Sequence, residues 1–435
     1  MADPTVAIAG GGLAGLTAAC HLAEAEVDVR LFERRAEVGG RVRTRERDGF
    51  LLDRGFQVLF TAYPAVSREL DLDALDLRRF DPGAAIARPG RRSVLADPFR
   101  DPGSLLGSAL NREVTPGDKL RTLLLRREAL RSDPGAVETD DRSIRTALRD
   151  RGFSTRFVEN FAAPFYGGIT LDRSLDDTSA YVFRYTFAML SRGATAVPAA
   201  GMGTLPAQLR TRAERAGARI ETDRAVRGVS ASGPGDGATV DLGGETVAAD
   251  AAVVATDPPT ARELTGVDAI PTDGRGCVTQ YLALDRGTAL DGARRLVLNP
   301  EDEGPNQVAP LSAVAPEYAP DGRSLLSATY LGSPGDDDAG LPDADDADLL
   351  ARTRATLEAW YPGRAFDGLE LLATDRISFA QFDQPPGFRT RLPSVDAPGG
   401  DLFLAGDYTR WSSIQGAMAS GRDAAEAVLG TLGGA

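Results

Sequence analysis

The alternation of apolar and polar positions is most regular at the start of the chain. A short apolar run at residues 5–9 (TVAIA) leads into the loop Gly10-Gly11-Gly12-Leu13-Ala14-Gly15, and LTAACHLA then follows with helical character. A second apolar run, VDVRLFE, ends on Glu33, eighteen residues past Gly15. Strand, glycine loop, helix, strand and terminal acid in this order predict a dinucleotide-binding βαβ unit.

Each glycine of this loop has a physical role. Gly10 allows the tight turn, Gly12 lets a pyrophosphate approach the backbone, and Gly15 lets helix and strand pack closely. The helix that follows presents free N–H groups and a positive dipole end to the phosphates. The final acid of the unit is placed to accept hydrogen bonds from ribose hydroxyls. The predicted cofactor residues here are Gly10, Gly12, Leu13, Ala14, Gly15 and Glu33.

After the first βαβ unit, the spacing of apolar residues becomes helical and then changes to the alternation of strands. Residues 102–192 are mostly helical in spacing, and residues 219–254 have the alternation of a β-meander. Both ends of the chain have the pattern of a nucleotide-binding domain, so the middle is expected to be inserted. The predicted cofactor domain is residues 1–80, 195–265 and 385–435, and the predicted second domain is residues 81–194 and 266–384. The strands expected in the second domain include residues 277–285, 324–332 and 369–379, with a helix at 346–360.

Composition narrows the function classes. There is one histidine, His21, and one lysine, Lys119, and the two cysteines are Cys20 and Cys277. These scarcities argue against a Ser-His-Asp triad, a Schiff-base lysine, a disulfide framework and a metal site, so no metal is predicted. No apolar run is long enough for a transmembrane helix, and the chain enters its first strand without a signal segment, which favours a cytoplasmic protein.

The charge pattern is strongly acidic. The formal net charge is −14, with aspartate clusters at 336–338 and 343–348. Nearly every basic residue is arginine, which a GC-rich genome also favours, but lysine depletion together with aspartate enrichment is what a high-salt cytoplasm selects. We therefore expect a halophilic protein, and no basic surface invites nucleic acid.

Three further glycine-rich segments favour a flavin over a nicotinamide. A second diglycine, Gly39-Gly40, lets another loop lie close to the pyrophosphate, and Arg41 directly after it can neutralise the phosphate charge. A turn at 53–57 allows backbone to lie beside an isoalloxazine, and the segment 402–421 predicts a strand, a loop and a helix start with almost no side-chain bulk, whose dipole would stabilise an anionic reduced ring. The predicted contacts are Arg34, Gly39, Gly40, Arg41, Gly55, Phe56, Gln57, Gly406, Asp407, Gly416 and Ala417.

These segments together resemble the FAD-dependent amine oxidase superfamily, in its phytoene desaturase/protoporphyrinogen oxidase-like branch. The resemblance rests on GGGLAGL, VGGRVRT, DRGFQ, PAAGMGTLPAQL, DRAVRGV and LFLAGDYTRW…IQGAMASGRDAA. It implies an α/β fold, namely a Rossmann-like FAD domain of the glutathione-reductase type with an inserted α+β substrate domain. It also implies that Val226 contacts the adenine, that Met202 and Gly203 lie near the flavin, and that Ile414 to Ala417 lie along the ring.

The chain departs from the superfamily pattern at two places. Many amine oxidases carry a lysine near flavin N5, but the corresponding strand, residues 277–281, has none. Ser413 stands where an aromatic-cage tyrosine is usual, although Trp411 and Tyr408 are nearby. Both departures argue against a typical amine oxidase.

The leading hypothesis is hydride exchange between FAD and a hydrophobic, isoprenoid- or carotenoid-like small molecule, a chemistry that needs no strong base. No residue is predicted to be catalytic; Asp407 and Gln57 are expected to position groups. The alternatives are an amine oxidase that lacks the usual lysine, which requires a cavity carboxylate, and a non-enzymatic flavoprotein, which requires a closed flavin. Contact with a membrane surface is compatible with the leading hypothesis.

That hypothesis predicts an aromatic, mainly apolar cavity with walls from the 153–190 helices and the 277–284 and 325–331 strands. The expected lining residues are Phe157, Phe161, Phe165, Tyr166, Phe183, Tyr185, Phe187, Tyr281, Tyr330 and Trp411.

Overall fold

A computed structural model describes most of the chain. The described residues are 4–96, 100–101, 103, 111–136, 140–231, 233–286, 290, 294–301, 303–332 and 344–433. The aspartate cluster at 336–338, the start of the cluster at 343–348 and part of the helical pattern expected after residue 102 lie outside the described residues.

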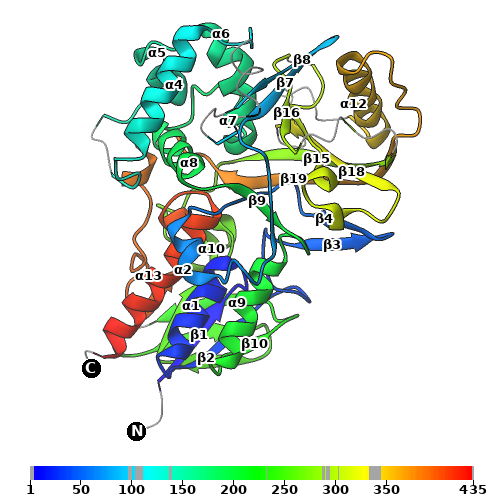
Figure 1. Ribbon diagram of the computed structural model, residues 1–435. Helices are drawn as coiled ribbons and strands as arrows, with labels where there is room; N and C mark the ends of the chain where they lie inside the picture. Colours follow the sequence, from blue (N-terminus) through cyan, green and yellow to red (C-terminus); the bar gives the residue numbers. More distant parts are fainter. Residues whose placement is uncertain are drawn as a thin grey trace.

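The lower half of the molecule in Figure 1 is built on a parallel sheet. Its five strands lie in the order β10 (Arg219–Glu221), β2 (Asp28–Phe32), β1 (Thr5–Ala9), β14 (Ala251–Val254) and β20 (Leu402–Leu404). The central strands β1 and β14 are buried on both faces, which explains their continuous apolar sequences.

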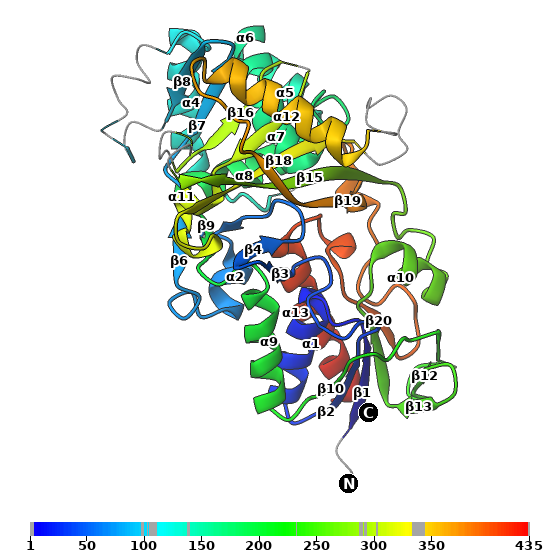
Figure 2. The ribbon, with the colours of Figure 1, turned by 90° about the vertical axis from the view of Figure 1, so that its right-hand side faces the viewer.

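Three helices cover one face of this sheet, and a small sheet covers the other (Figure 2). The helices are α1 (Leu13–Glu24), α9 (Thr204–Arg215) and α13 (Ile414–Leu432). The small sheet is antiparallel and contains β11 (Gly228–Ala231), β12 (Ala238–Asp241) and β13 (Thr246–Ala249).

The meander predicted for residues 219–254 is therefore only partly correct. Its middle forms the three-stranded antiparallel sheet, but its two ends, β10 and β14, join the parallel sheet beside β2 and β1. Periodicity detects the strands but not their partners, because pairing is decided by segments distant in the chain.

The upper half contains a seven-stranded mixed sheet. Its order is β19 (Glu370–Phe382), β15 (Gly274–Asp285), β18 (Arg323–Leu331), β17 (Gln307–Ala309), β16 (Leu296–Leu298), β7 (Ala84–Arg88) and β8 (Arg91–Leu95). Helix α12 (Asp346–Trp360) packs against one face through Leu357 and Trp360. The smaller connecting elements are β3 (Thr44–Arg47), β4 (Phe50–Asp53), β5 (Leu59–Phe60), α2 (Pro64–Glu69), β6 (Leu77–Arg79), β9 (Thr195–Pro198), α10 (Pro258–Thr265) and α11 (Leu311–Val314).

A helical lobe lies at the end of the molecule opposite the two termini (Figure 1). It consists of α4 (Pro116–Ala129), α5 (Ile144–Asp150), α6 (Thr155–Phe157), a π-helical turn (Val158–Ala162), α7 (Ala163–Thr170) and α8 (Ala180–Arg192). Hydroxyl side chains begin four of these helices: Thr115 forms a capping box with Asp118, and Ser143, Ser154 and Ser179 each accept a backbone N–H. Each cap fixes the residue at which one of these helices begins.

The parallel sheet takes its strands from residues 1–80, 195–265 and 385–435, whereas the seven-stranded sheet takes its strands from the two intervening segments. The division into two domains stays a prediction. Among the described residues, no helix is both long enough and apolar enough to cross a lipid bilayer.

Candidate functional site

A cavity of about 1180 Å³ runs from the glycine loop after β1 into the helical lobe. At one end it is lined by predicted nucleotide-binding residues, and at the other by phenylalanines of the helices. We call these the nucleotide end and the chamber. The chamber is lined by Phe153, Phe157, Phe161, Phe165, Tyr166, Phe183, Phe187 and Leu190, together with residues of α4.

The glycine loop has the geometry that its sequence predicts. A Cβ at Gly10, whose φ is +109°, would lie 2.6 Å from the Ala255 carbonyl oxygen, and a Cβ at Gly15 would collide with the Gly10 carbonyl. A Cβ at Gly12 would meet no atom within 4 Å, because Gly12 faces the cavity. Leu13 and Ala14 line the cavity at the start of α1, where no side chain caps the helix. Open backbone and a free helix N-terminus suit the phosphates of a dinucleotide.

Glu33 is buried beside this loop. Its Oε2 accepts the Gly11 N–H at 2.8 Å, and its Oε1 accepts the Arg35 N–H at 3.0 Å. Each carboxylate oxygen retains a second acceptor position, and Glu33 lines the cavity. The residue therefore shapes the loop and leaves room for the predicted ribose contact.

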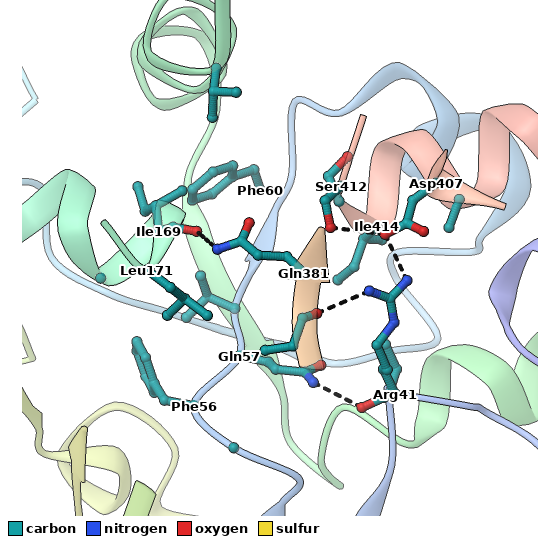
Figure 3. A pocket seen from close by; sticks show the side chains of 18 of the residues that line it. Arg41, Phe56, Gln57, Phe60, Ile169, Leu171, Gln381, Asp407, Ser412 and Ile414 are labelled. Atoms are coloured by element: carbon teal, nitrogen blue, oxygen red, sulfur yellow. Dashed lines mark hydrogen bonds and ion pairs between the residues drawn. The ribbon is translucent and has the colours of Figure 1, made fainter. Parts of the chain in front are cut away.

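The second diglycine lies against the first. The Gly39 N–H donates to the Gly11 carbonyl at 2.7 Å, and Gly39 and Gly40 both have positive φ, +118° and +59°. The Arg41 side chain then crosses the cavity, where its guanidinium bonds Asp407 at 2.6 Å and the Ala380 carbonyl at 2.9 Å (Figure 3). The cavity is also lined by the predicted residues Arg34, Val226, Gly406, Ile414 and Ala417.

Gly416 differs from its prediction. Helix α13 begins at Ile414, and the Gly416 N–H is occupied by the Ser413 hydroxyl at 2.8 Å. Gly416 is not among the residues that line the cavity, and a Cβ there would collide with the Trp411 carbonyl. Gly421 is likewise needed for helix packing, because a Cβ there would collide with the Ala14 carbonyl on α1. The small residues of this helix therefore serve close packing at these two positions.

The turn at Gly55, Phe56 and Gln57 lines the cavity and is held from behind. The Tyr281 hydroxyl donates toward the carbonyls of Asp53 at 2.7 Å and Gly55 at 2.9 Å, and the Gly55 N–H donates to Asp375 at 2.9 Å. Tyr281 is fully buried and does not line the cavity, so its predicted role as a cavity residue is corrected.

Asp53 is the buried centre of this support, and sequence reasoning assigned it no role. Its carboxylate accepts the Thr44 hydroxyl at 2.5 Å, the Met202 N–H at 2.9 Å and the Tyr318 hydroxyl at 2.9 Å. Burial raises the pKa of Asp53 to about 6, although these hydrogen bonds oppose the rise. The acid that opens the DRGFQ segment was the signal that could have found it.

Met202 and Gly203 also belong to this support. Met202 is fully buried, its N–H bonds Asp53, and the Gly203 N–H bonds the Thr44 hydroxyl at 2.8 Å. Neither residue is part of the cavity lining, so they act one layer behind the position that the resemblance implied.

The remaining corrections concern two tyrosines. Tyr330 faces α12, where its hydroxyl bonds the Leu349 carbonyl at 3.0 Å and Thr353 at 2.8 Å. Tyr185 packs against Tyr63 and Trp411, with ring centroids 6.1 Å and 5.0 Å away, and does not line the cavity. Alternate residues of a strand face opposite sides of the sheet, and a helix buries more than one face, so sequence alone does not say whether Tyr330 on β18 or Tyr185 on α8 faces the cavity.

Strand β19 supplies the wall that was expected from β15 and β18. Residues 376–381 of β19 line the cavity one after another, whereas β15 contributes Cys277. The pattern predicts a strand at 369–379, but not that it pairs with β15 and lines the cavity, because pairing depends on segments distant in the chain.

Phenylalanines at every fourth position form the chamber wall. The ring centroids of Phe153 and Phe157 are 4.4 Å apart, those of Phe157 and Phe161 5.5 Å, and those of Phe161 and Phe165 5.3 Å. The π-helical turn Val158–Ala162 lies within this row. Phe183 continues the aromatic surface on α8, 4.8 Å from Tyr166. The predicted lining by Phe157, Phe161, Phe165, Tyr166, Phe183, Phe187 and Trp411 agrees with the cavity.

A narrow group of side chains joins the two ends of the cavity. Phe56, Phe60 and Ile169 face a common space, with Gln57 and Gln381 beside it (Figure 3). The Gln57 amide nitrogen bonds the Arg41 carbonyl at 2.9 Å, and its amide oxygen is buried without a partner. The Gln381 amide nitrogen bonds the Ile169 carbonyl at 3.2 Å. These carboxamides are the polar groups at the junction.

The charged groups of the cavity are unevenly distributed. The lining carboxylates Glu33, Asp257, Glu263 and Asp407 lie at the nucleotide end. Beyond the junction, the described lining contains one carboxylate, Asp81, which bonds Arg294 at 2.9 Å. Lys119, the lone lysine, is on α4 and bonds the Asn111 carbonyl at 3.0 Å. Arg100 and Arg126 also line this part of the cavity, so the described chamber combines an aromatic wall with three cations and one paired carboxylate.

The chain is similar to known proteins both in sequence and in fold. The family model described as flavin containing amine oxidoreductase matches residues 13–429. A carotenoid 3,4-desaturase of Haloarcula japonica is 40% identical over 82 residues, which are 18% of this chain and 17% of that protein. A zeta-carotene desaturase of Synechocystis is 24% identical over 486 aligned residues, covering 98% of this chain and 97% of that protein.

Two solved structures illustrate the shared fold. A crystal structure described as a putative protoporphyrinogen oxidase from Exiguobacterium has a TM-score of 0.73 at 18% identity, covering 100% of both chains. Cyclohexylamine oxidase from Brevibacterium oxydans has a TM-score of 0.71 at 16% identity, covering 99% of this chain and 100% of that one. At these identities the likeness concerns the fold alone.

Proposed function

Because the chain belongs to the flavin-containing amine oxidoreductase family, we propose that it exchanges a hydride with a hydrophobic, isoprenoid- or carotenoid-like substrate. The family assignment makes the chain an FAD-dependent oxidoreductase. The resemblance to the desaturase and protoporphyrinogen oxidase-like branch and the α/β FAD-binding fold are confirmed. The substrate class is the part that we propose.

The donor set of the nucleotide end fits FAD. Gly12 leaves open space beside the uncapped start of α1, and Glu33 offers acceptors, while the Arg41 guanidinium that lines the cavity is already paired with Asp407. Bound FAD supplies a two-electron acceptor and donor at its isoalloxazine ring. The turn at Gly55, fixed by Tyr281 and its neighbours, then orients backbone toward the junction with the chamber.

The observation that carries the proposal is the continuity of the cofactor site with an aromatic chamber. The row of phenylalanines on α6, the π-helical turn and α7 offers flat apolar surface to an extended unsaturated molecule. Such a chamber excludes water, and hydride exchange at a carbon needs no charged base in the chain. Gln57 and Gln381 are assigned to positioning at the junction.

The amine alternative needs a carboxylate that holds an ammonium group. Asp81 is the carboxylate of the described chamber lining, and Arg294 already bonds it at 2.9 Å. A paired carboxylate attracts a cationic substrate weakly, so this geometry favours the hydrophobic substrate. A closed, non-enzymatic flavoprotein is disfavoured because the cavity extends well beyond the nucleotide end.

The activities of two relatives support a carotenoid-like substrate. One acts on carotenoids at the 3,4 position, and another is a zeta-carotene desaturase. The match to the carotenoid 3,4-desaturase covers only 17% of that relative, so the transfer of substrate class is part of the proposal.

Anaerobic mixing of the FAD-loaded protein tests the proposal. Polyprenyl and carotenoid compounds in detergent micelles, and primary amines and polyamines in buffer, are added separately while the flavin absorbance is followed. Bleaching by the isoprenoids and not by the amines is expected. If only amines bleach the flavin, the amine oxidase alternative replaces the proposal. If oxidised FAD is unaffected, chemically reduced protein is mixed with the more unsaturated compounds to test the opposite direction.

A further inference from the structure

A buried carboxamide interrupts the aromatic wall of the chamber. Gln307, the first residue of β17, lines the cavity and is 2% exposed. It lies against Gly168 of α7, where an added Cβ would be 2.7 Å from the Gln307 Oε1 and 3.0 Å from its Nε2. Gly168 follows Phe165 by three residues and so lies next to it on the helix surface. The amide of Gln307 therefore occupies the place that a side chain at position 168 would take at the end of the phenylalanine row.

A chain of hydrogen bonds fixes the orientation of this amide. Asn306 donates from Nδ2 to the Pro164 carbonyl at 2.9 Å, and its Oδ1 accepts from the Arg173 guanidinium at 3.2 Å. Arg173 is held in turn by two backbone carbonyls, at 2.8 Å and 3.0 Å. Because these partners fit Asn306 in only one orientation, its Nδ2 also faces Gln307 as a donor. The Gln307 atom that meets this donor is therefore the acceptor Oε1.

The other end of the amide, Nε2, is left for the cavity. No described residue accepts a hydrogen bond from the Gln307 Nε2, and the atom is not sealed off by protein, so it opens into the cavity that Gln307 lines. A buried donor that meets no acceptor costs about 1–3 kcal/mol. The protein thus directs two N–H groups at whatever occupies this part of the chamber.

The position and the chemistry of these donors restrict the acceptor. Gly168 directly precedes Ile169, whose carbonyl accepts from Gln381 at the junction with the nucleotide end (Figure 3). The donors therefore lie near the junction. A carboxamide is uncharged, so it selects an oxygen that accepts hydrogen bonds rather than a negative charge. A hydroxyl or carbonyl oxygen on an otherwise apolar molecule fits both conditions.

We propose that Gln307 donates its amide N–H groups to a hydroxyl or carbonyl oxygen of the substrate, so that the preferred substrates are oxygenated isoprenoids. The isoprenoid body rests on the proposed function, whereas the selection of an oxygen rests on Gln307. A site built to hydrogen-bond an oxygen disfavours the analogue that lacks it, because its buried donors are then left unmet. The same bond sets how far the molecule enters the chamber and which of its carbons reach the junction.

Equilibrium binding to the FAD-loaded, full-length protein tests this hydrogen bond without requiring turnover. The probes are farnesol, the related ketone farnesylacetone and the hydrocarbon farnesene, and their dissociation constants are corrected for partition into the detergent micelles that dissolve them. Quenching of the protein fluorescence, to which the cavity residue Trp411 contributes, reports binding. The parent protein should bind the two oxygenated compounds about tenfold more tightly than farnesene.

Two variants remove the donors in different ways. Gln307→Met keeps nearly the same volume without a donor, so it should weaken binding of farnesol and farnesylacetone about tenfold and leave farnesene unchanged. Gly168→Ala leaves Gln307 in the chain, but the added Cβ would displace its amide and should also lower the preference for oxygen.

Gln280→Met is the matched control. Gln280 is fully buried on β15 of the same sheet, its Nε2 bonds the Asp346 carbonyl at 3.0 Å, and it is not part of the described cavity lining. This variant should leave all three affinities unchanged. Circular dichroism and FAD content show whether each variant is folded.

Each outcome decides one question. Equal affinity of the parent for the three compounds, no binding of any of them, or a preference that Gln307→Met retains overturns the role of Gln307. If Gln307→Met does not fold, an unchanged preference in Gly168→Ala overturns it instead. A Gln307-dependent preference without flavin bleaching contradicts only the proposed function. Bleaching by isoprenoids without any preference for oxygen contradicts only the role of Gln307.

Discussion

At the nucleotide end of the cavity the wall is backbone and glycine, whereas in the chamber the wall is aromatic side chain. Gly10, Gly12 and Gly15 occupy positions where a Cβ either collides with a neighbouring carbonyl or enters the open site. In the chamber, Phe157 and Phe161 contact one another and their neighbours ring against ring. The two ends of one cavity are thus specified by different physical means.

Because the two walls differ in this way, the residues that bind the cofactor are expected to tolerate few changes, whereas the residues that contact the substrate can vary. At Gly10 and Gly15 the backbone wall tolerates almost no substitution, because an added Cβ would meet a fixed carbonyl, whereas at Gly12 it would enter the space left for the cofactor. A side-chain wall can change shape through volume changes that cost stability but leave the backbone in place. We expect the same separation in experiments: changes at the nucleotide end remove FAD, and changes in the chamber alter the substrate.

The largest effect is expected at Gly15. Valine at this position would collide with the Gly10 carbonyl and separate the loop from α1. We expect Gly15→Val to destabilise the protein by more than about 4 kcal/mol and to yield colourless protein. Thermal melting and flavin absorbance measure both effects.

Gly12→Ala is the matched control for that change. Gly12 has a φ of −77°, and a Cβ added there would have no atom within 4 Å, so alanine should leave the melting temperature almost unchanged. Only FAD affinity should fall. Yellow, stable Gly15→Val protein would refute the distinction between the two ends.

The next effect is expected in the chamber. Phe157 is 5% exposed and stacks on Phe153. Phe157→Ala should lower the free energy of unfolding by about 3–4 kcal/mol, while bound FAD per folded protein stays constant. Isoprenoid-driven bleaching should weaken.

Phe366→Ala provides the comparison for Phe157. Phe366 is fully buried near Trp360 and Tyr361, in a cluster that is not part of the cavity lining. It should cost similar stability without any change in bleaching. Equal losses of bleaching in the two variants would show that the chamber has no special role.

Asp53, behind the turn between the two ends, should contribute a pH dependence. Burial raises the pKa of Asp53 from 3.8 to about 6. Between about pH 4 and about pH 6 the folded protein therefore keeps a proton on Asp53 that the unfolded chain has already released. Stability from this group is therefore present below about pH 4 and is lost as pH rises through about 6, by about 3 kcal/mol in total. Asp53→Asn should remove that slope.

Urea unfolding of parent and Asp53→Asn protein between pH 4 and 7 measures the difference directly. The comparison of the two proteins cancels the titration of the many surface acids. A constant difference in the free energy of unfolding across this range would contradict a titrating Asp53. FAD content, measured in parallel, shows whether the support acts on the nucleotide end.

The smallest effect is expected at Glu33. Glu33→Ala removes the acceptors for the Gly11 and Arg35 N–H groups and the predicted ribose contact. FAD binding should weaken by about 1–3 kcal/mol. Fluorescence titration of the apoprotein with FAD measures it, and an unchanged dissociation constant would place the ribose elsewhere.

The nucleotide end was predictable because its determinants are local. The loop from Gly10 to Gly15 needs no side-chain contacts from distant segments to be recognised, and its geometry agrees with the roles assigned to each glycine. The strands β15 and β18 and the helix α12 were also recognisable from periodicity alone.

Tertiary structure alone decided which faces meet the cavity. Tyr281 and Cys277 lie on one strand, yet only Cys277 lines the cavity, because Tyr281 is used to hold the Gly55 turn. Gly416 is buried against a carbonyl that lies five residues earlier, and residues 376–381 became a cavity wall because β19 pairs with β15. Pairing, packing and solvent exclusion are properties of segments brought together by folding. A sequence pattern therefore specifies each element, and the assembled protein specifies what each face touches.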